Sequence, residues 1–245
     1  MIKNRLLLFL LFSLYIISLS ASIAQAAVTI LDNFNRSDGP IDGTWTVQSG
    51  TFNVVNSAVQ GGDYALATFN GKSSNILEAD VEATGSGVQY VALVLGYRDL
   101  NNNYFIKAQD DDGGTPEFNR LYCYYGNNIP RPNWANDPIS LSPSFSSAHM
   151  RVEYNPSTHN VTITFSNIDG GSGTQQYICP DAPLTGGNGI GIGSFNISRG
   201  KLDNFAADLS PVAIPTLTEW GMIIFVVLAG LGSVYFLRRQ KRVIS

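Results

Sequence analysis

The stretch that decides the fold class is NILEADVEAT, residues 75–84. Apolar and acidic side chains alternate along it, with Leu77 and Val81 on one face and Glu78 and Glu82 on the other. Successive side chains of a β-strand point to opposite faces, so this pattern is typical of a strand with one buried and one solvated face. Antiparallel sheets that pack one face on a core show the same alternation. The sequence therefore predicts an all-β domain.

Similar short segments, separated by clusters of Gly, Asn, Asp and Ser, continue on both sides of this stretch. Residues 89–97 are almost continuously apolar, as in a strand buried on both faces. Residues 44–48 and 51–55 are expected to pair as a hairpin around Ser49-Gly50, and the proline-rich residues 127–147 are expected to form a long loop. About a dozen short strands at regular spacing, without a convincing helix, predict a two-sheet antiparallel jelly-roll sandwich.

The charge balance narrows the classes of partner. The full chain has 15 basic and 19 acidic residues. Its central part, residues 27–217, keeps nine of the basic and 18 of the acidic residues, a net charge of −9. Such a surface repels phosphate backbones, so nucleic acid is excluded as an expected partner. The length suffices for one β domain with its own core.

The N-terminus has the parts of a secretory signal peptide, predicted over residues 1–26. Lys3 and Arg5 precede a mostly apolar run over residues 6–17, and Ala24-Gln25-Ala26 is a small-x-small cleavage site. We expect signal peptidase to cleave there, so that the mature chain begins near Ala27 outside the cytoplasm.

The C-terminus combines a polar motif, an apolar span and a basic end. Residues 221–237 contain no charge, and a span of about 17 residues is the short limit for crossing a hydrocarbon core. The cations within residues 238–242 favour a cytoplasmic C-terminus. We expect a linker and motif over residues 211–217 and a transmembrane helix with a basic cytoplasmic tail over residues 218–245. Hydropathy alone supports an uncut membrane anchor equally well.

Seven residues make this tail specific: Ile214, Pro215, Thr216, Leu217, Glu219, Trp220 and Gly221. With the apolar span and basic end in this order, the tail resembles the IPTL-CTERM sorting signal of Gram-negative bacteria. That signal is related to the PEP-CTERM tails read by exosortase-type transpeptidases. The resemblance implies an inner-membrane intermediate with its domain in the periplasm. Cleavage near the motif by an exosortase-type enzyme and transfer to the cell surface or extracellular matrix would follow.

The central part also resembles a known family. The segments that carry this resemblance include Asp32-Asn33-Phe34, Trp45, Leu77-Glu78-Ala79-Asp80-Val81, Gly96-Tyr97-Arg98-Asp99 and Leu202-Asp203-Asn204-Phe205. Their order is similar to that of laminin G-like, concanavalin A-like sandwiches, over residues 27–210. The resemblance implies a curved two-sheet jelly roll. Lectins, adhesion modules and glycanases share that fold, so the fold alone does not assign a function.

One motif suggests catalysis. Glu78-Ala79-Asp80-Val81-Glu82 resembles the Glu-x-Asp-x-Glu strand of family 16 glycoside hydrolases. The resemblance implies that Glu78 is the nucleophile, Glu82 the acid/base and Asp80 the residue that tunes Glu78. The period of two places all three carboxylates on one face. The alternative is the solvated face of a half-exposed strand, and no tryptophan flanks the motif to hold a sugar ring.

A non-catalytic sugar site is the other candidate, formed by Arg98, Lys107, Tyr122, Tyr124 and Trp134. Tyr122 and Tyr124 alternate onto one strand face, where rings can stack on the apolar face of a sugar. Arg98 and Lys107 would bring hydrogen-bond donors to the same sheet, and Trp134 stands on the long loop. The alternative is that these rings pack the core or fix the loop.

Two residue pairs have expected structural roles. The first and last strands of a concanavalin A-like fold lie side by side, and some relatives bind a structural calcium there through oxygen ligands, which implies a site at Asp32 and Asp203. The alternative is that both carboxylates accept backbone hydrogen bonds, and no other cofactor is required. Cys123 and Cys179 both lie in the exported part, where a disulfide is permitted. Two buried free thiols are the alternative.

We therefore expect an exported, surface-sorted, non-catalytic protein that mediates adhesion or binds a glycan or matrix polymer in the envelope or biofilm. A family 16-like glycanase that uses Glu78 and Glu82 is one alternative. A purely structural matrix protein is the other.

Overall fold

The computed structural model describes residues 28–126, 138–183, 185–195 and 199–209. The chain divides into one compact unit that ends at Leu209 and a second unit, residues 210–245. The second unit lies outside the described residues, as does the expected signal peptide, so the structure tests neither the predicted signal peptide nor the predicted transmembrane helix. Within the described ranges, no helix is long and apolar enough to span a bilayer.

Apart from one short 3₁₀ turn, η1 (Ile168–Gly170), the regular elements of the described residues are strands. They are β1 (Val28–Asp32), β2 (Gly39–Pro40), β3 (Trp45–Val55), β4 (Ala58–Ser73), β5 (Ile76–Ala83), β6 (Gln89–Asp99), β7 (Asn102–Asp110), β8 (Phe118–Tyr125), β9 (Ile139–Phe145), β10 (Ser147–Asn155), β11 (Asn160–Ser166), β12 (Gln175–Cys179), β13 (Gly189–Phe195) and β14 (Gly200–Asp208). The all-β class that the alternation at residues 75–84 predicts is confirmed.

The strands form one antiparallel hydrogen-bonded order, β12-β11-β10-β5-β14-β4-β13-β6-β7-β8-β9, with β1 beside β14 and β2-β3 beside β4. We call β12-β11-β10-β5-β14-β1 sheet A and β3-β4-β13-β6-β7-β8-β9 sheet B. The long strand β4 joins them, because Val59 pairs with Leu202 of β14 whereas residues 65–68 pair with β13. The first and last strands, β1 and β14, are neighbours, as the family resemblance implies.

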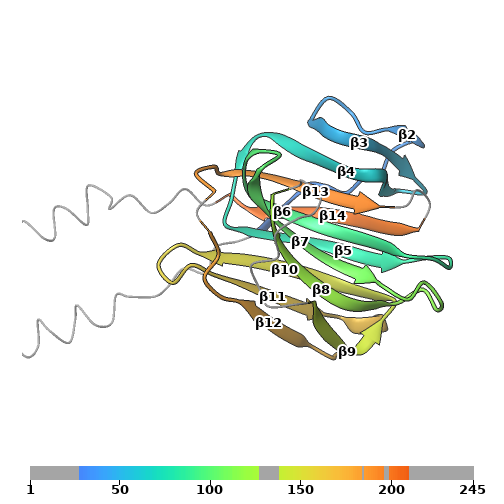
Figure 1. The fold of residues 1–245 in the computed structure, drawn as a ribbon. Coiled ribbons are helices and arrows are strands. Elements are labelled where there is room, and N and C mark those ends of the chain that lie inside the picture. Colours follow the sequence, from blue (N-terminus) through green and yellow to red (C-terminus); the bar gives the residue numbers. More distant parts are fainter. Residues whose placement is uncertain (1–27, 127–137, 184, 196–198, 210–245) are drawn as a thin grey trace, which may run out of the picture. The chain divides into compact units, whose positions relative to one another are not determined.

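The two sheets face each other as layers of a sandwich. A disulfide joins Cys123 on β8 to Cys179 on β12, with 6.5 Å between their Cα atoms. These strands lie near opposite ends of the hydrogen-bonded order, so the order folds back on itself (Figure 1). The described residues therefore form a jelly-roll-like sandwich, as predicted.

The core lies between the layers and follows the period of two. On β5, Leu77 and Ala79 are fully buried and Val81 is 2% exposed, while the acidic residues between them point outward. On β6 the inward side chains include Val91 and Leu93, which belong to the same cluster. Each fully buried aliphatic side chain of this size stabilises the fold by about 1.5–3 kcal/mol.

Two local expectations are wrong. Residues 44–48 and 51–55 do not pair with each other, because all of them except Thr44 belong to one strand, β3, which bends at Gly50 (φ 65°) and pairs along its length with β4. The turn of this hairpin is Asn56-Ser57, with left-handed φ angles of 52° and 59°, as two-residue turns require. The expected loop also contains a strand, β9, paired with β8 at the end of sheet B. An edge strand tolerates Pro143 because its missing N–H can face away from the ladder.

Candidate functional site

The outer face of sheet B, opposite the core, carries an apolar cluster of its own. Its buried members are Leu66, Tyr90, Ala92, Val94 and Phe105. A Cβ atom added at Gly193 would collide with the ring of Phe105, so the glycine lets that ring lie against the sheet. Every residue from Gln89 to Gly96 is buried, which confirms that β6 is covered on both faces. Side chains on this outer face are therefore held in place by packing.

Beside this apolar centre, three tyrosine rings surround the ammonium group of Lys107, a set we call the tyrosine–lysine cluster. The Nζ atom lies 4.2 Å from the ring centroid of Tyr122, 4.7 Å from that of Tyr90 and 4.9 Å from that of Tyr124. Lys107 pairs in register with Tyr122 across β7 and β8, which puts both on one face. The Tyr122 and Tyr124 rings stack with centroids 5.3 Å apart. Cation–π attraction stabilises a lysine that is only 7% exposed.

A polar chain borders the cluster. Lys107 donates to Gln109, Gln109 donates to Asp111, and the Tyr122 hydroxyl donates to Asp111 Oδ2 over 2.7 Å. The Nε atom of Arg120 lies 3.8 Å from the same carboxylate. Burial, followed by the hydrogen bond to Asp111, raises the pKa of Tyr122, which keeps its hydroxyl protonated as a donor. Rings next to ordered donors and acceptors are what a sugar needs, because its ring faces are apolar and its edges carry hydroxyls.

The structure brings together some of the predicted ligand residues. Lys107, Tyr122 and Tyr124 meet as expected, whereas Arg98 does not join them. The partner of Lys107 on β6 is Ala92, and Arg98 lies six positions further along, a distance of about 20 Å on an extended strand. The Arg98 side chain is 64% exposed, and its Nε atom lies 4.0 Å from Asp99 Oδ2. Trp134 lies outside the described residues.

Tyr90 was missed by the sequence reasoning, together with the polar neighbours Gln109, Asp111 and Arg120. The alternation along β7 does indicate that the side chains of Lys107 and Gln109 point to the same face of the sheet. To place them beside the tyrosines of β8, one also needs the pairing register between β7 and β8, which the sequence alone does not determine.

The outer face of sheet A holds the acidic motif of β5 in a network of ion pairs. The Nδ1 atom of His149 lies 2.8 Å from Asp80 Oδ1 and its Nε2 atom lies 3.3 Å from Glu78 Oε2. Arg151 donates to Glu78, and Asn204 Nδ2 donates to Asp80 Oδ2 over 2.7 Å. The hydrogen bond with His149 lowers the pKa of Asp80 and raises that of His149. These carboxylates thus already have partners within the fold.

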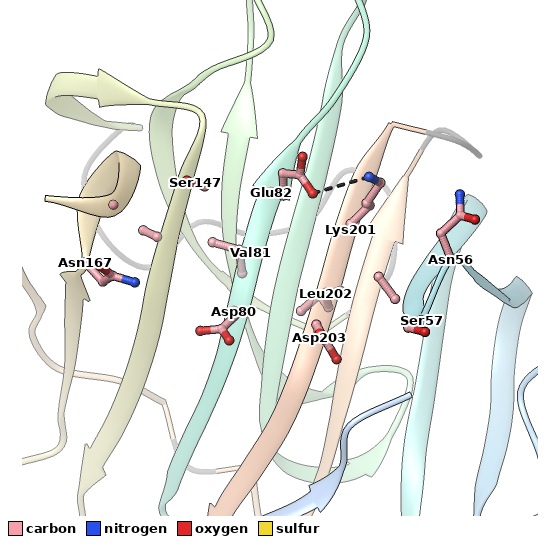
Figure 2. A pocket seen from close by; sticks show the side chains of 13 residues that line it. Asn56, Ser57, Asp80, Val81, Glu82, Ser147, Asn167, Lys201, Leu202 and Asp203 are labelled. Atoms are coloured by element: carbon pink, nitrogen blue, oxygen red, sulfur yellow. Dashed lines mark hydrogen bonds and ion pairs between the residues drawn. The ribbon is translucent and has the colours of Figure 1, made fainter. Parts of the chain in front are cut away.

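A pocket of about 410 Å³ lies on this face, with Asp80 and Glu82 of β5 and Lys201 and Asp203 of β14 in its lining. Figure 2 shows the ion pair between Glu82 and Lys201, whose Oε2 and Nζ atoms are 3.3 Å apart. Burial, followed by the charges of Asp80 and Asp32, raises the pKa of Asp203. Neither Glu78 nor an aromatic side chain belongs to the described lining. Glu78 and Glu82 therefore do not share an aromatic-lined cleft in the described residues, and the glycanase alternative gains no support from this geometry.

Asp32, a predicted calcium ligand, is occupied by protein donors. Its carboxylate accepts hydrogen bonds from Arg36, from Trp45 Nε1 and from the Phe34 backbone N–H. In the described part of the chain, no group of three or more His, Cys, Asp or Glu side chains is arranged to hold a metal ion. Calcium at Asp32 and Asp203 stays a prediction, and an ion there would compete with the Arg36 guanidinium.

The chain carries a known sorting motif, because the IPTL-CTERM motif family matches residues 212–240. The resemblance of residues 214–221 to this signal is thereby confirmed. The motif implies processing by a sorting enzyme and is typical of an exported, envelope-associated protein. No curated protein sequence matches the chain.

Solved structures with a similar fold include sugar-binding proteins and a glycanase. One is a carbohydrate-binding module from Bacillus subtilis, at 15% identity over 66% of this chain and 93% of that chain, with a TM-score of 0.47. Another is lectin II from Ulex europaeus, at 9% identity over 74% and 97%, with a TM-score of 0.45. A third is the catalytic domain of an endo-1,3-β-glucanase from Thermotoga petrophila, at 13% identity over 75% and 99%, with a TM-score of 0.44. At these levels the neighbours assign no ligand, so function is argued from this chain's own residues.

Proposed function

We propose that this exported, envelope-associated protein binds a glycan or matrix polymer through the tyrosine–lysine cluster of sheet B, without catalysis. The observation that carries the proposal is the stacked pair Tyr122–Tyr124, with the Lys107 ammonium against both rings. Both tyrosines are half-buried, so packing fixes their rings while part of each remains accessible.

The bordering polar groups supply the second half of sugar recognition. Asp111 accepts hydrogen bonds, Arg120 donates them, and both side chains keep partial exposure of 31% and 40%. A sugar hydroxyl that meets such groups replaces its bonds to water, and hydrogen bonds to charged groups contribute about 1.5–3 kcal/mol each. The fixed rings supply the apolar contact and the charged border supplies orientation.

Sheet A supports binding less well. Its carboxylates are engaged by His149, Arg151 and Lys201, and the described lining of its pocket lacks a ring. The exported location that the sorting motif implies is where envelope and matrix glycans are found. A glycan-binding role therefore combines the tail and the fold in one account.

The proposal is tested on a glycan array that spans neutral and acidic polysaccharides, probed with the purified full-length chain in detergent. Binding to one polysaccharide class is expected, and Tyr122→Ala should weaken it by about two- to twelvefold, since an aromatic contact contributes about 0.5–1.5 kcal/mol. Lys107→Met keeps the stem and removes the charge, and should also weaken binding.

The matched control is Tyr177→Ala, which truncates a half-buried tyrosine on β12 of sheet A, packed beside Phe165. Its binding should equal that of the wild type once circular dichroism shows both variants folded. Equal losses in Tyr122→Ala and Tyr177→Ala would contradict the proposed site, and an array without any bound glycan would contradict the proposed function.

A further inference from the structure

The rings on the outer face of sheet B continue beyond the tyrosine–lysine cluster. Tyr64 of β4 packs on Phe195 of β13 with ring centroids 4.6 Å apart, and Phe195 stacks on Tyr90 of β6 at 5.6 Å and 16°. Tyr90 then contacts Lys107 of β7, which contacts Tyr122 of β8. One uninterrupted row of contacts thus crosses five neighbouring strands, approximately perpendicular to them.

The strand pairing supports this row independently of the ring distances. Phe195 pairs directly with Tyr90, and Ala92 pairs with Lys107, which pairs with Tyr122. Neighbouring strands are about 4.8 Å apart, so the four steps from β4 to β8 span about 19 Å. The row is longer than a mono- or disaccharide.

Exposure is concentrated at the two ends of the row. Tyr64 is 45% exposed, whereas Tyr90 is 2% and Lys107 is 7% exposed between the ends. Tyr122 and Tyr124 are half-buried at the other end. A ligand that uses both accessible ends must therefore reach across the sheet.

The backbone at Tyr64 gives a separate reason to assign it a role. Its φ angle is +56°, a left-handed conformation that is costly for a bulky side chain. In this conformation the ring packs on Phe195. Held strain of this kind concentrates at ligand contacts.

We infer that the ligand is an extended polysaccharide chain that lies across the strands of sheet B, with Tyr64 as the contact for its distal sugar units. The inference rests on the proposed function and adds the binding mode. The protein would recognise several consecutive sugar units rather than a single sugar. An adhesin or matrix component that binds in this way can bind at repeated positions along one polysaccharide chain.

The test measures affinity against chain length for laminari-, cello-, chito- and galacturonan oligosaccharides of one to six units, by calorimetry with the full-length chain in detergent. In the series that binds, affinity should rise by about two- to twelvefold from the disaccharide to the hexasaccharide, as expected for one added ring contact. Tyr64→Ala should remove this rise and leave disaccharide affinity unchanged. Tyr122→Ala should weaken the binding of both the disaccharide and the hexasaccharide.

Two controls separate stacking from folding. Tyr64→Phe keeps the ring and should bind as the wild type does. Val47→Ala truncates a side chain on β3 that is 42% exposed and pairs with Ala67, away from the row, and should have no effect. Equal affinity for disaccharide and hexasaccharide, or a length effect that survives Tyr64→Ala, overturns the inference while the proposed function stands. Binding to none of the four series, together with a polysaccharide array that shows no bound glycan, overturns both.

Discussion

Replacing Asp32 tests how the first strand is fixed to the sandwich. The Asp32 side chain is 7% exposed. It accepts two bonds from Arg36, at 2.8 and 3.0 Å, one from Trp45 Nε1 at 2.7 Å and one from the Phe34 N–H at 2.8 Å. Asp32→Ala removes all of these acceptors at once.

The magnitude follows from which donors can reach water. The Trp45 side chain and the Phe34 backbone are buried, and a buried donor left without a partner costs about 1–3 kcal/mol. The Arg36 side chain is 28% exposed, so its lost ion pair adds at most about 1 kcal/mol. We expect Asp32→Ala to lower the free energy of unfolding by about 2–7 kcal/mol, a large share of the 5–15 kcal/mol typical of a domain.

The assay is urea unfolding of the full-length chain, followed by far-ultraviolet circular dichroism. Asp32→Asn, which keeps the volume and one acceptor oxygen, should lose less than Asp32→Ala. Asp38→Ala removes an exposed carboxylate that accepts one backbone bond and should lose less than about 1 kcal/mol. A loss below 1 kcal/mol for Asp32→Ala would refute the reasoning. A melting temperature that calcium raises in the wild type but not in Asp32→Ala would favour the calcium alternative.

Three further predictions concern pH, redox state and processing. The hydrogen bond to Asp80 raises the pKa of His149 above 6.5, so the stabilisation from protonated His149 is complete below pH 6.5 and is lost as the pH rises through the raised pKa of the folded state. The urea midpoint of the wild type should therefore fall from pH 6 to pH 9, and that of His149→Gln should change less. An equal pH dependence of the two midpoints would contradict this. Reducing Cys123–Cys179, which are 56 residues apart, should cost about 4 kcal/mol of stability, and an unchanged midpoint after reduction would disprove the contribution. Intact mass spectrometry of the mature protein should find both ends trimmed, near Ala27 and near residues 214–221, and a product ending at Ser245 would exclude cleavage of the tail.

The fold was predictable where periodicity determines burial. The alternation from Leu77 to Ala83 fixes both the strand and its inward face, and the continuous apolar run of β6 predicts burial on two sides. The hairpin predicted around Gly50 was wrong because a glycine with positive φ occurs both in turns and in bends within a strand. Only the pairing of β3 with β4 distinguishes the two cases.

The candidate site was predictable only in part, because its members meet through register. Tyr122 and Tyr124 share a face by alternation, but their contact with Lys107 depends on how β7 pairs with β8. Tyr90 stands in a run where both faces are apolar, so the sequence gives no sign that its ring points outward. The bonds from Asp32 to Arg36 and Trp45 form in an irregular segment, where no period predicts partners.

The most direct test of sugar binding at the tyrosine–lysine cluster is a crystal structure of the protein with the hexasaccharide that binds best in the length series. The account predicts density for a sugar ring stacked on Tyr122 or Tyr124, with further units extending over β6 and β13 toward Tyr64. A hexasaccharide seated instead in the pocket between Asp80 and Asp203 of sheet A would contradict it.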